Sequence, residues 1–127
     1  MSHAPPTPHP ADLPSNPTLE VGPDSVGWLR FDDPDRKMNV FTEQVMTALD
    51  RRLDEATELA RAGRLAALVV ISDKPDSFFA GADVAAIESI EDPGEGAAAA
   101  RAGQAVFHKL ADLGVPTIAA VNGICVG

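Results

Sequence analysis

The sequence is poor in cysteine, and Cys125 is the single one among its 127 residues. A disulfide within the chain is therefore excluded, and the composition fits a reducing compartment. No apolar run approaches the roughly 20 residues that a membrane-spanning helix requires. The N-terminus also lacks the charged region and apolar segment of a secretory signal. We therefore expect a cytoplasmic protein with no membrane span.

Basic residues are scarce as well. The chain has 10 Lys and Arg against 19 Asp and Glu, which gives a net charge of −9. Nucleic acids and anionic membrane surfaces both require a basic patch, so neither is an expected partner. An anionic ligand would need local cations or helix N-termini to overcome this overall charge.

Metal-binding and nucleotide-binding patterns are missing too. His108 has no second ligand at metal spacing, so no metal site is expected. The segment Gly94-Glu95-Gly96 lacks the rest of a dinucleotide fingerprint, and no Walker pattern occurs. Cys125 has no histidine nearby, so a thiol nucleophile is not expected. We expect no cofactor within this chain.

The apolar share of 45% is sufficient for a globular core. A length of 127 residues suits one domain or a piece of a larger one. Residues 1–17 are rich in proline and have only Leu13 to bury, which predicts a disordered leader; a polyproline-type ligand for a partner is the alternative. Residues 18–127 are expected to form the folded part.

Strand and helix patterns alternate along residues 18–127. A hairpin is expected from strands at 18–21 and 25–31, and Thr42 is a candidate N-cap for a helix that stops at Gly63. Non-alternating apolar segments at 65–72 and 117–121 predict strands buried on both faces of a parallel sheet. Further helices are expected from Asp83 to about residue 90 and from about 97 to 113, with Asp92-Pro93-Gly94 as a break. The fold class is α/β.

The turn Gly81-Ala82-Asp83 follows the apolar pair Phe78-Phe79 and opens a helix. Glycine lets the backbone approach a ligand closely, and N–H groups at a helix start lack intrahelical acceptors. Such groups are ready donors to an oxyanion, and Asp83 would cap the helix near residue 85 or 86. A tight turn with an Asp-capped helix and no ligand explains the same three residues.

Four separated segments resemble the enoyl-CoA hydratase/isomerase (crotonase) family in order and spacing. They are Lys37-Met38-Asn39-Val40-Phe41, residues 67–72, residues 78–84, and residues 115–123 together with Gly127. The resemblance covers roughly residues 18–127. The Lys-Met-Asn segment and the loop at 72–78 look most like the alpha subunit of multifunctional fatty-acid-oxidation complexes.

The resemblance implies a partial crotonase-like (ClpP/crotonase) fold of repeated ββα units, truncated before the second oxyanion-hole helix. It implies that the Ala82 N–H forms one half of an oxyanion hole for an acyl-CoA thioester, and that Gly127 starts the motif that supplies the other half. The family's two catalytic glutamates would lie beyond Gly127, so the 127-residue chain itself is expected to be inactive. Asn39 is expected to stabilise its loop rather than touch ligand. The implied substrate-binding residues are Arg36, Lys37, Met38, Gly81, Ala82, Asp83 and Val84.

The implied reaction is the addition of water to 2-enoyl-CoA thioesters in fatty-acid β-oxidation. CoA is then part of the substrate, and NAD enters only if a 3-hydroxyacyl-CoA dehydrogenase domain follows. The full-length protein would be oligomeric or in a complex with a thiolase subunit. Two alternatives stay open: another crotonase-superfamily activity, such as an isomerase or dehalogenase, and a non-catalytic α/β binding module. For Arg36 and Lys37, a solvated loop charge is the alternative to phosphate binding.

Overall fold

The computed structural model of the chain describes residues 16–127. In chain order the elements are β1 (Thr18–Val21), β2 (Val26–Phe31), α1 (Glu43–Arg61), β3 (Ala67–Ser72), β4 (Ser77–Phe79), α2 (Val84–Glu88), α3 (Pro93–Ala111), β5 (Thr117–Ala120) and β6 (Ile124–Cys125). The part of the predicted leader at residues 1–15 lies outside the described residues. The Asn16 side chain accepts a hydrogen bond from the Asp32 N–H at 2.8 Å, and Pro17 is fully buried.

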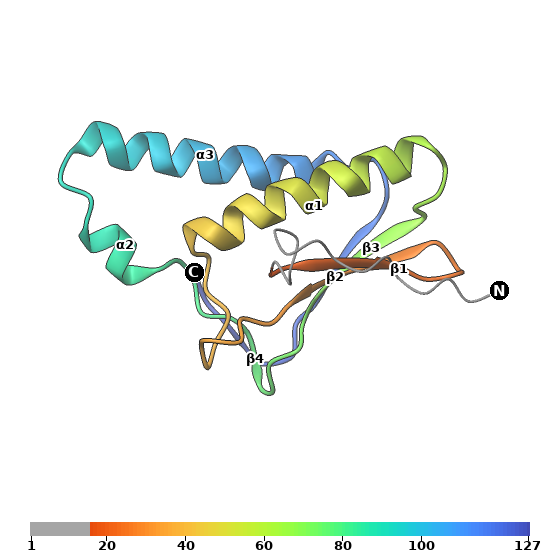
Figure 1. The fold of residues 1–127 in the computed structure, drawn as a ribbon, viewed down its shortest axis with the longest axis horizontal. Coiled ribbons are helices and arrows are strands. Elements are labelled where there is room, and N and C mark those ends of the chain that lie inside the picture. The colour runs from red at the N-terminus through yellow and green to blue at the C-terminus, as the bar shows by residue number, and fades with distance from the viewer. Residues whose placement is uncertain (1–15) are drawn as a thin grey trace.

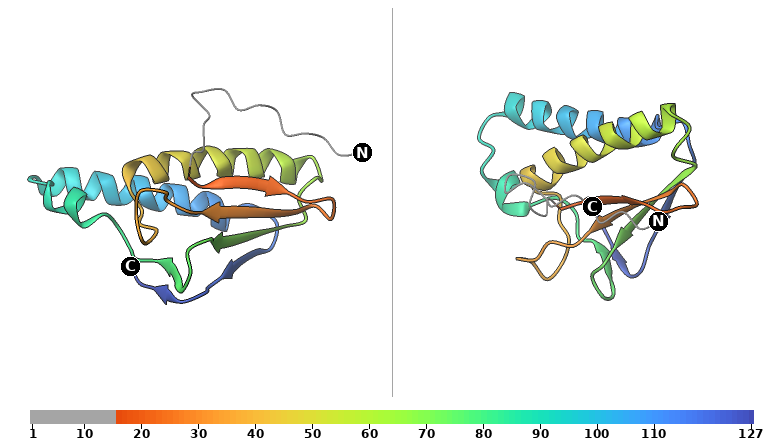
Figure 2. Two further views of the ribbon diagram at one scale, coloured as in Figure 1. Left: turned by 60° about the horizontal axis from the view of Figure 1, so that its bottom comes forward. Right: turned by 45° about the vertical axis from the view of Figure 1, so that its right-hand side comes forward.

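The elements form two layers (Figure 1). Strands β1, β2, β3 and β5 make a four-stranded sheet in that order, and β4 pairs with β6 in a separate small sheet. Helices α1 and α3 run side by side across one face of the larger sheet, as both views in Figure 2 show. Helix α2 has no buried residues and leads from β4 to the start of α3. The α/β class expected from the sequence is therefore confirmed.

The strand pairing follows the expected pattern. Strands β1 and β2 form an antiparallel hairpin in which Leu19 is opposite Leu29. Strand β2 then pairs in parallel with β3, and β3 pairs in parallel with β5. Parallel neighbours need a long crossover, and α1 and the α2–α3 segment supply the two crossovers. The hairpin and the parallel sheet were both predicted correctly.

Helix α1 provides much of the core. Thr42 is its N-cap and accepts a hydrogen bond from the Val45 N–H at 3.1 Å. Leu49 and Leu53 are fully buried against the sheet, consistent with their helical spacing. Beyond the helix, Gly63 takes the left-handed conformation with a φ of 70°, as a C′ glycine does. The sequence prediction for this helix is confirmed at both ends.

Helix α3 starts earlier than expected. The sequence predicts a break at Asp92-Pro93-Gly94 and a helix from about Ala97, but the helix runs from Pro93. Asp92 is its N-cap and accepts a hydrogen bond from the Gly94 N–H at 3.1 Å. Proline is favoured at the first helical position because its missing N–H has no intrahelical partner there. The same three residues therefore start the helix.

The two apolar strands of the parallel sheet differ in burial. In β3, Leu68 and Val69 are buried, whereas residues 117–119 of β5 are exposed and Ile118 retains 52% of its accessible surface. Strand β5 has only one neighbour within the described residues, and the helices cover one face of the sheet. The expectation of a second strand buried on both faces was wrong for residues 16–127. None of the helices in this range is sufficiently long and apolar to cross a membrane.

Candidate functional site

The turn after β4 meets the last residues of the chain. Strand β4 pairs in parallel with β6, and the Val126 N–H donates to the Phe79 carbonyl at 3.0 Å. This pairing places Gly127 beside Gly81, so that a Cβ on Gly81 would lie 3.3 Å from the Gly127 Cα. Gly81 has a φ of 89°, a conformation that other residues rarely adopt. The two glycine segments singled out in the sequence are therefore adjacent in space.

The Ala82 N–H is free for a ligand. Its own peptide is anchored through the Gly81 carbonyl, which accepts a hydrogen bond from the Phe41 N–H at 2.9 Å. Within residues 16–127 the Ala82 N–H has no hydrogen-bond acceptor, and the residue is exposed to solvent. A backbone donor held in place without an acceptor is the arrangement that an oxyanion requires.

Asp83 braces this turn. Its carboxylate caps helix α2 by accepting a hydrogen bond from the Ala85 N–H at 3.2 Å, as predicted. The other carboxylate oxygen lies 3.8 Å from a guanidinium nitrogen of Arg36. Val84, the first residue of the helix, is exposed. Asp83 is thus committed to holding the turn.

An apolar hollow of about 370 Å³ lies next to the glycine pair. All five phenylalanines of the sequence line it, and Gly127 is also one of its lining residues. The ring of Phe41 stacks on that of Phe79 at a centroid distance of 4.3 Å and meets Phe107 edge-on at 5.3 Å. Aromatic and aliphatic walls of this kind bind apolar groups. Sequence reasoning missed this hollow, because its residues come from separate elements that only the fold brings together.

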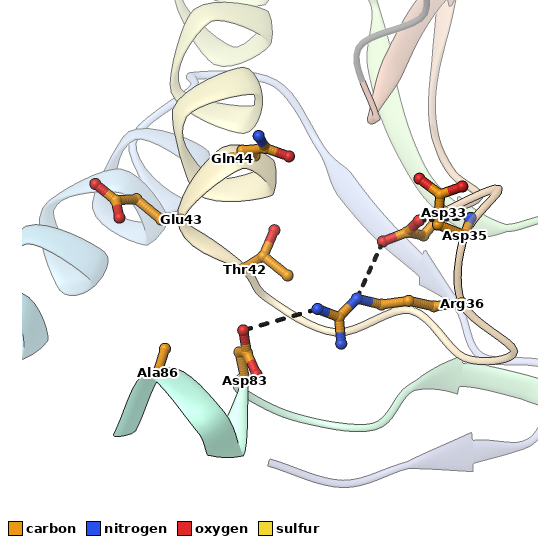
Figure 3. Close-up of a pocket in the computed structure, with 8 residues that line it drawn as sticks. All are labelled: Asp33, Asp35, Arg36, Thr42, Glu43, Gln44, Asp83 and Ala86. Carbon is orange, nitrogen blue, oxygen red and sulfur yellow. Dashed lines mark hydrogen bonds and ion pairs between the residues drawn. The ribbon is translucent and has the colours of Figure 1, made fainter. Parts of the chain in front are cut away.

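A second hollow, also about 370 Å³, is strongly acidic (Figure 3). Arg36 spans it and pairs with Asp33 at 3.5 Å and with Asp83 at 3.8 Å. Asp35 and Glu43 add further carboxylates to its wall. Two carboxylates therefore compete with any phosphate for the Arg36 guanidinium.

The other predicted binding residues on this loop differ from Arg36. Lys37 is exposed and forms no ion pair with any residue from 16 to 127, whereas Met38 is half-buried. Of Arg36 and Lys37, Lys37 is therefore the one whose charge can pair with an anionic ligand. No group of three His, Cys, Asp or Glu side chains in the described part of the chain is arranged to hold a metal ion.

Asn39 is almost completely buried, with 1% of its surface exposed. Its side-chain amide donates to the Phe31 carbonyl at 3.1 Å and to Ser72 Oγ at 2.9 Å, and its side-chain oxygen accepts from the Asp33 N–H at 3.1 Å. The expectation that Asn39 stabilises the loop before α1 is confirmed.

Comparisons with known proteins identify the family of the chain. The model of the family described as enoyl-CoA hydratase/isomerase matches residues 22–127. The chain is similar to the fatty acid oxidation complex subunit alpha of Vibrio cholerae, at 41% identity over 100 residues, covering 79% of this chain and 14% of the relative. The corresponding subunit of Aliivibrio fischeri is 36% identical over 104 residues, with coverages of 82% and 15%. The chain thus spans about one seventh of the length of these relatives.

Solved structures give the same answer for the fold. An enoyl-CoA hydratase from Bacillus anthracis superposes with a TM-score of 0.76 at 20% identity, covering 88% of this chain and 42% of that one. The Pseudomonas aeruginosa protein PA4980 superposes with a TM-score of 0.68 at 32% identity, with coverages of 91% and 47%. The partial crotonase-like fold implied by the sequence resemblance is therefore confirmed, and the chain belongs to the enoyl-CoA hydratase/isomerase family.

Proposed function

We propose that this chain supplies the thioester-binding part of an enoyl-CoA hydratase. The observation that carries the proposal is the unengaged Ala82 N–H in the turn where Gly81 lies against Gly127, a residue that lines an apolar hollow. The thioester oxygen would accept a hydrogen bond from Ala82 and a second one from the motif that starts at Gly127. The acyl chain would enter the hollow lined by the phenylalanines.

Hydration places charge on the thioester oxygen. Water adds its oxygen to C3 of the 2-enoyl group, and the electron pair of the double bond moves through C2 and the carbonyl carbon to that oxygen. The resulting enolate collapses when C2 takes a proton. Donors fixed at the oxygen stabilise this charge, and losing one such donor typically costs about 2.7–4 kcal/mol of transition-state stabilisation.

The proton transfers require an acid and a base that the described residues do not offer at this turn. The nearest carboxylate in sequence, Asp83, is occupied by the Ala85 N–H and by Arg36. In our proposal the two glutamates implied by the resemblance perform this step, so the 127-residue chain alone is not expected to hydrate a substrate.

The proposed substrate and partners follow from the same comparisons. Lys37, with Arg36 beside it, would meet the CoA phosphates. Because the curated relatives are named as subunits of fatty acid oxidation complexes, we propose assembly with another subunit, a thiolase by the resemblance, or self-association. NAD would be used only by a dehydrogenase domain elsewhere in the full-length protein.

Paired substitutions at Ala82 test the proposal in the full-length protein. Ala82→Pro removes the N–H and should lower kcat for crotonyl-CoA hydration by about 10²–10³-fold, whereas Ala82→Gly keeps the N–H and should retain most of the activity. Hydration is followed by the loss of absorbance of the conjugated thioester. Equal losses in the two variants would contradict the proposal. Double-bond migration in the wild-type product without hydration would assign the isomerase reaction instead.

A further inference from the structure

We propose that Asn39 is a positioning residue that sets the direction of the Ala82 N–H. The hydrogen bonds that carry this inference are independent of the reaction, but its catalytic consequence rests on the proposed function. Three sets of contacts connect Asn39 to the donor: those of the Ala82 peptide, those of the backbone of residues 39–41, and those of the Asn39 side chain.

The first link is the Gly81–Ala82 peptide. In a trans peptide the C=O and the N–H point in opposite directions. The Gly81 carbonyl accepts from the Phe41 N–H at 2.9 Å, so the Ala82 N–H must point away from the backbone of Phe41. Rotating this peptide would break the bond to Phe41. The direction of the Ala82 N–H is therefore set by the backbone of Phe41 and not by the turn alone.

The second link is the segment from Asn39 to Phe41. The Asn39 carbonyl accepts from the Ala80 N–H at 2.9 Å, so two backbone hydrogen bonds bracket the turn at Ala80 and Gly81. Phe41 and Ala82 form an isolated parallel bridge outside the named strands. Because this bridge is isolated, no continuous ladder of strand hydrogen bonds holds residues 39–41 in position.

The third link is the Asn39 side chain, which fixes that segment to three strands. Its amide nitrogen donates to the carbonyl at the end of β2 (Phe31), to the hydroxyl at the end of β3 (Ser72), and more weakly, at 3.4 Å, to the carbonyl of Phe78 in β4. Its oxygen accepts from the Asp33 N–H. A primary amide is the one uncharged side-chain group with two donors and an acceptor in a single plane.

Asn39→Asp tests this chain of contacts in the full-length protein, because it keeps the shape and the oxygen facing Asp33 but replaces the donor with an acceptor. The Ala82 donor should then lose its fixed direction, and misplacing a catalytic group by about 1 Å costs on the order of 10²-fold in rate. We expect kcat to fall by about 10-fold to 100-fold while KM changes by less than about threefold. Ser72→Ala removes a single partner of Asn39 and should give a smaller effect of the same kind.

Leu53→Ala is the matched control, since Leu53 is fully buried in α1 and has no hydrogen bond to Asn39 or to the turn at residues 80–82. It should lower the melting temperature at least as much as Asn39→Asp and leave kcat at 25 °C within about threefold, because lost packing alone does not redirect the donor. Hydrogen exchange by mass spectrometry adds a readout that needs no activity. Asn39→Asp should speed exchange in the peptide covering residues 78–84, where the Ala80 N–H is protected, and Leu53→Ala should not do so selectively.

The outcomes separate the two claims. A kcat loss with local exchange in the Asn39 variant, absent from the Leu53 variant, supports the inference. Unchanged kcat and exchange in both Asn39→Asp and Ser72→Ala, or equal kcat losses in Leu53→Ala, would overturn it. If the wild-type protein hydrates no enoyl-CoA, the proposed function fails, and hydrogen exchange at residues 78–84 alone then decides whether Asn39 positions the turn.

Discussion

Replacing Gly81 with alanine should damage both the stability of the protein and its thioester site, for two reasons that can be separated. The first is the backbone, because a φ of 89° places a non-glycine residue in a left-handed conformation that costs about 1–2 kcal/mol. The second is contact, since the new Cβ would lie 3.3 Å from the Gly127 Cα and 3.4 Å from the Val126 carbonyl oxygen. The first distance is shorter than an optimal carbon contact of about 3.5–4.0 Å, so the Gly127 backbone must shift slightly, whereas the second is an ordinary van der Waals contact.

Gly114→Ala is the matched control for this experiment. Gly114 has a φ of 84°, and a Cβ there would meet nothing within 4 Å. Both variants should lose about 1–2 kcal/mol of unfolding free energy in a denaturant titration. Only Gly81→Ala should also lower kcat, by about 10-fold to 100-fold, because complete loss of an oxyanion donor costs about 10²–10³-fold. Equal kcat values for the two variants would refute the idea that the spacing of Gly81 and Gly127 matters.

Two further predictions concern charged side chains. Hydrogen bonds to Asp50 and Asp54 raise the pKa of Lys109 above its ordinary value of 10.5. This contact between α3 and α1 therefore stabilises the fold at pH values below 10.5, and the stabilisation is lost as the pH rises through the raised pKa of Lys109. Lys109→Met should therefore lower the melting temperature slightly at neutral pH and low salt but not at strongly alkaline pH; a constant difference across that range would contradict this. Lys37→Ala should raise the KM for acyl-CoA more than Arg36→Ala does, because two carboxylates already engage Arg36; steady-state kinetics with the order reversed would exclude this assignment.

Local signals in the sequence predicted local structure well. The start of α1 follows from the Thr42 side chain, and its end from the left-handed Gly63. The cap of α2 by Asp83 follows from the same rules. The predicted start of α3 was wrong because Asp-Pro is typical of both a helix break and a helix N-terminus. Only the hydrogen bond from the Gly94 N–H to the Asp92 side chain decides between them.

Features that depend on pairing between distant segments were harder to predict. Apolar composition indicated that β5 could be buried, but burial depends on what covers the strand, and Ile118 is half exposed. The resemblance singled out Gly81 and Gly127, yet their adjacency is produced by the pairing of β4 with β6, a strand that the sequence did not reveal. The aromatic hollow has the same origin, since Phe41 and Phe107 meet only when α3 packs beside α1.

The central claim is that the Ala82 N–H binds a thioester oxygen, and the vibration of that carbonyl reports on it directly. Crotonyl-CoA labelled with ¹³C at the thioester carbonyl should show a lower C=O stretching frequency when bound to the full-length protein, because hydrogen bonds polarise the carbonyl. The shift should shrink in Ala82→Pro and persist in Ala82→Gly at saturating ligand. An unshifted carbonyl in the wild-type complex, or the same shift in all three proteins, would contradict the account.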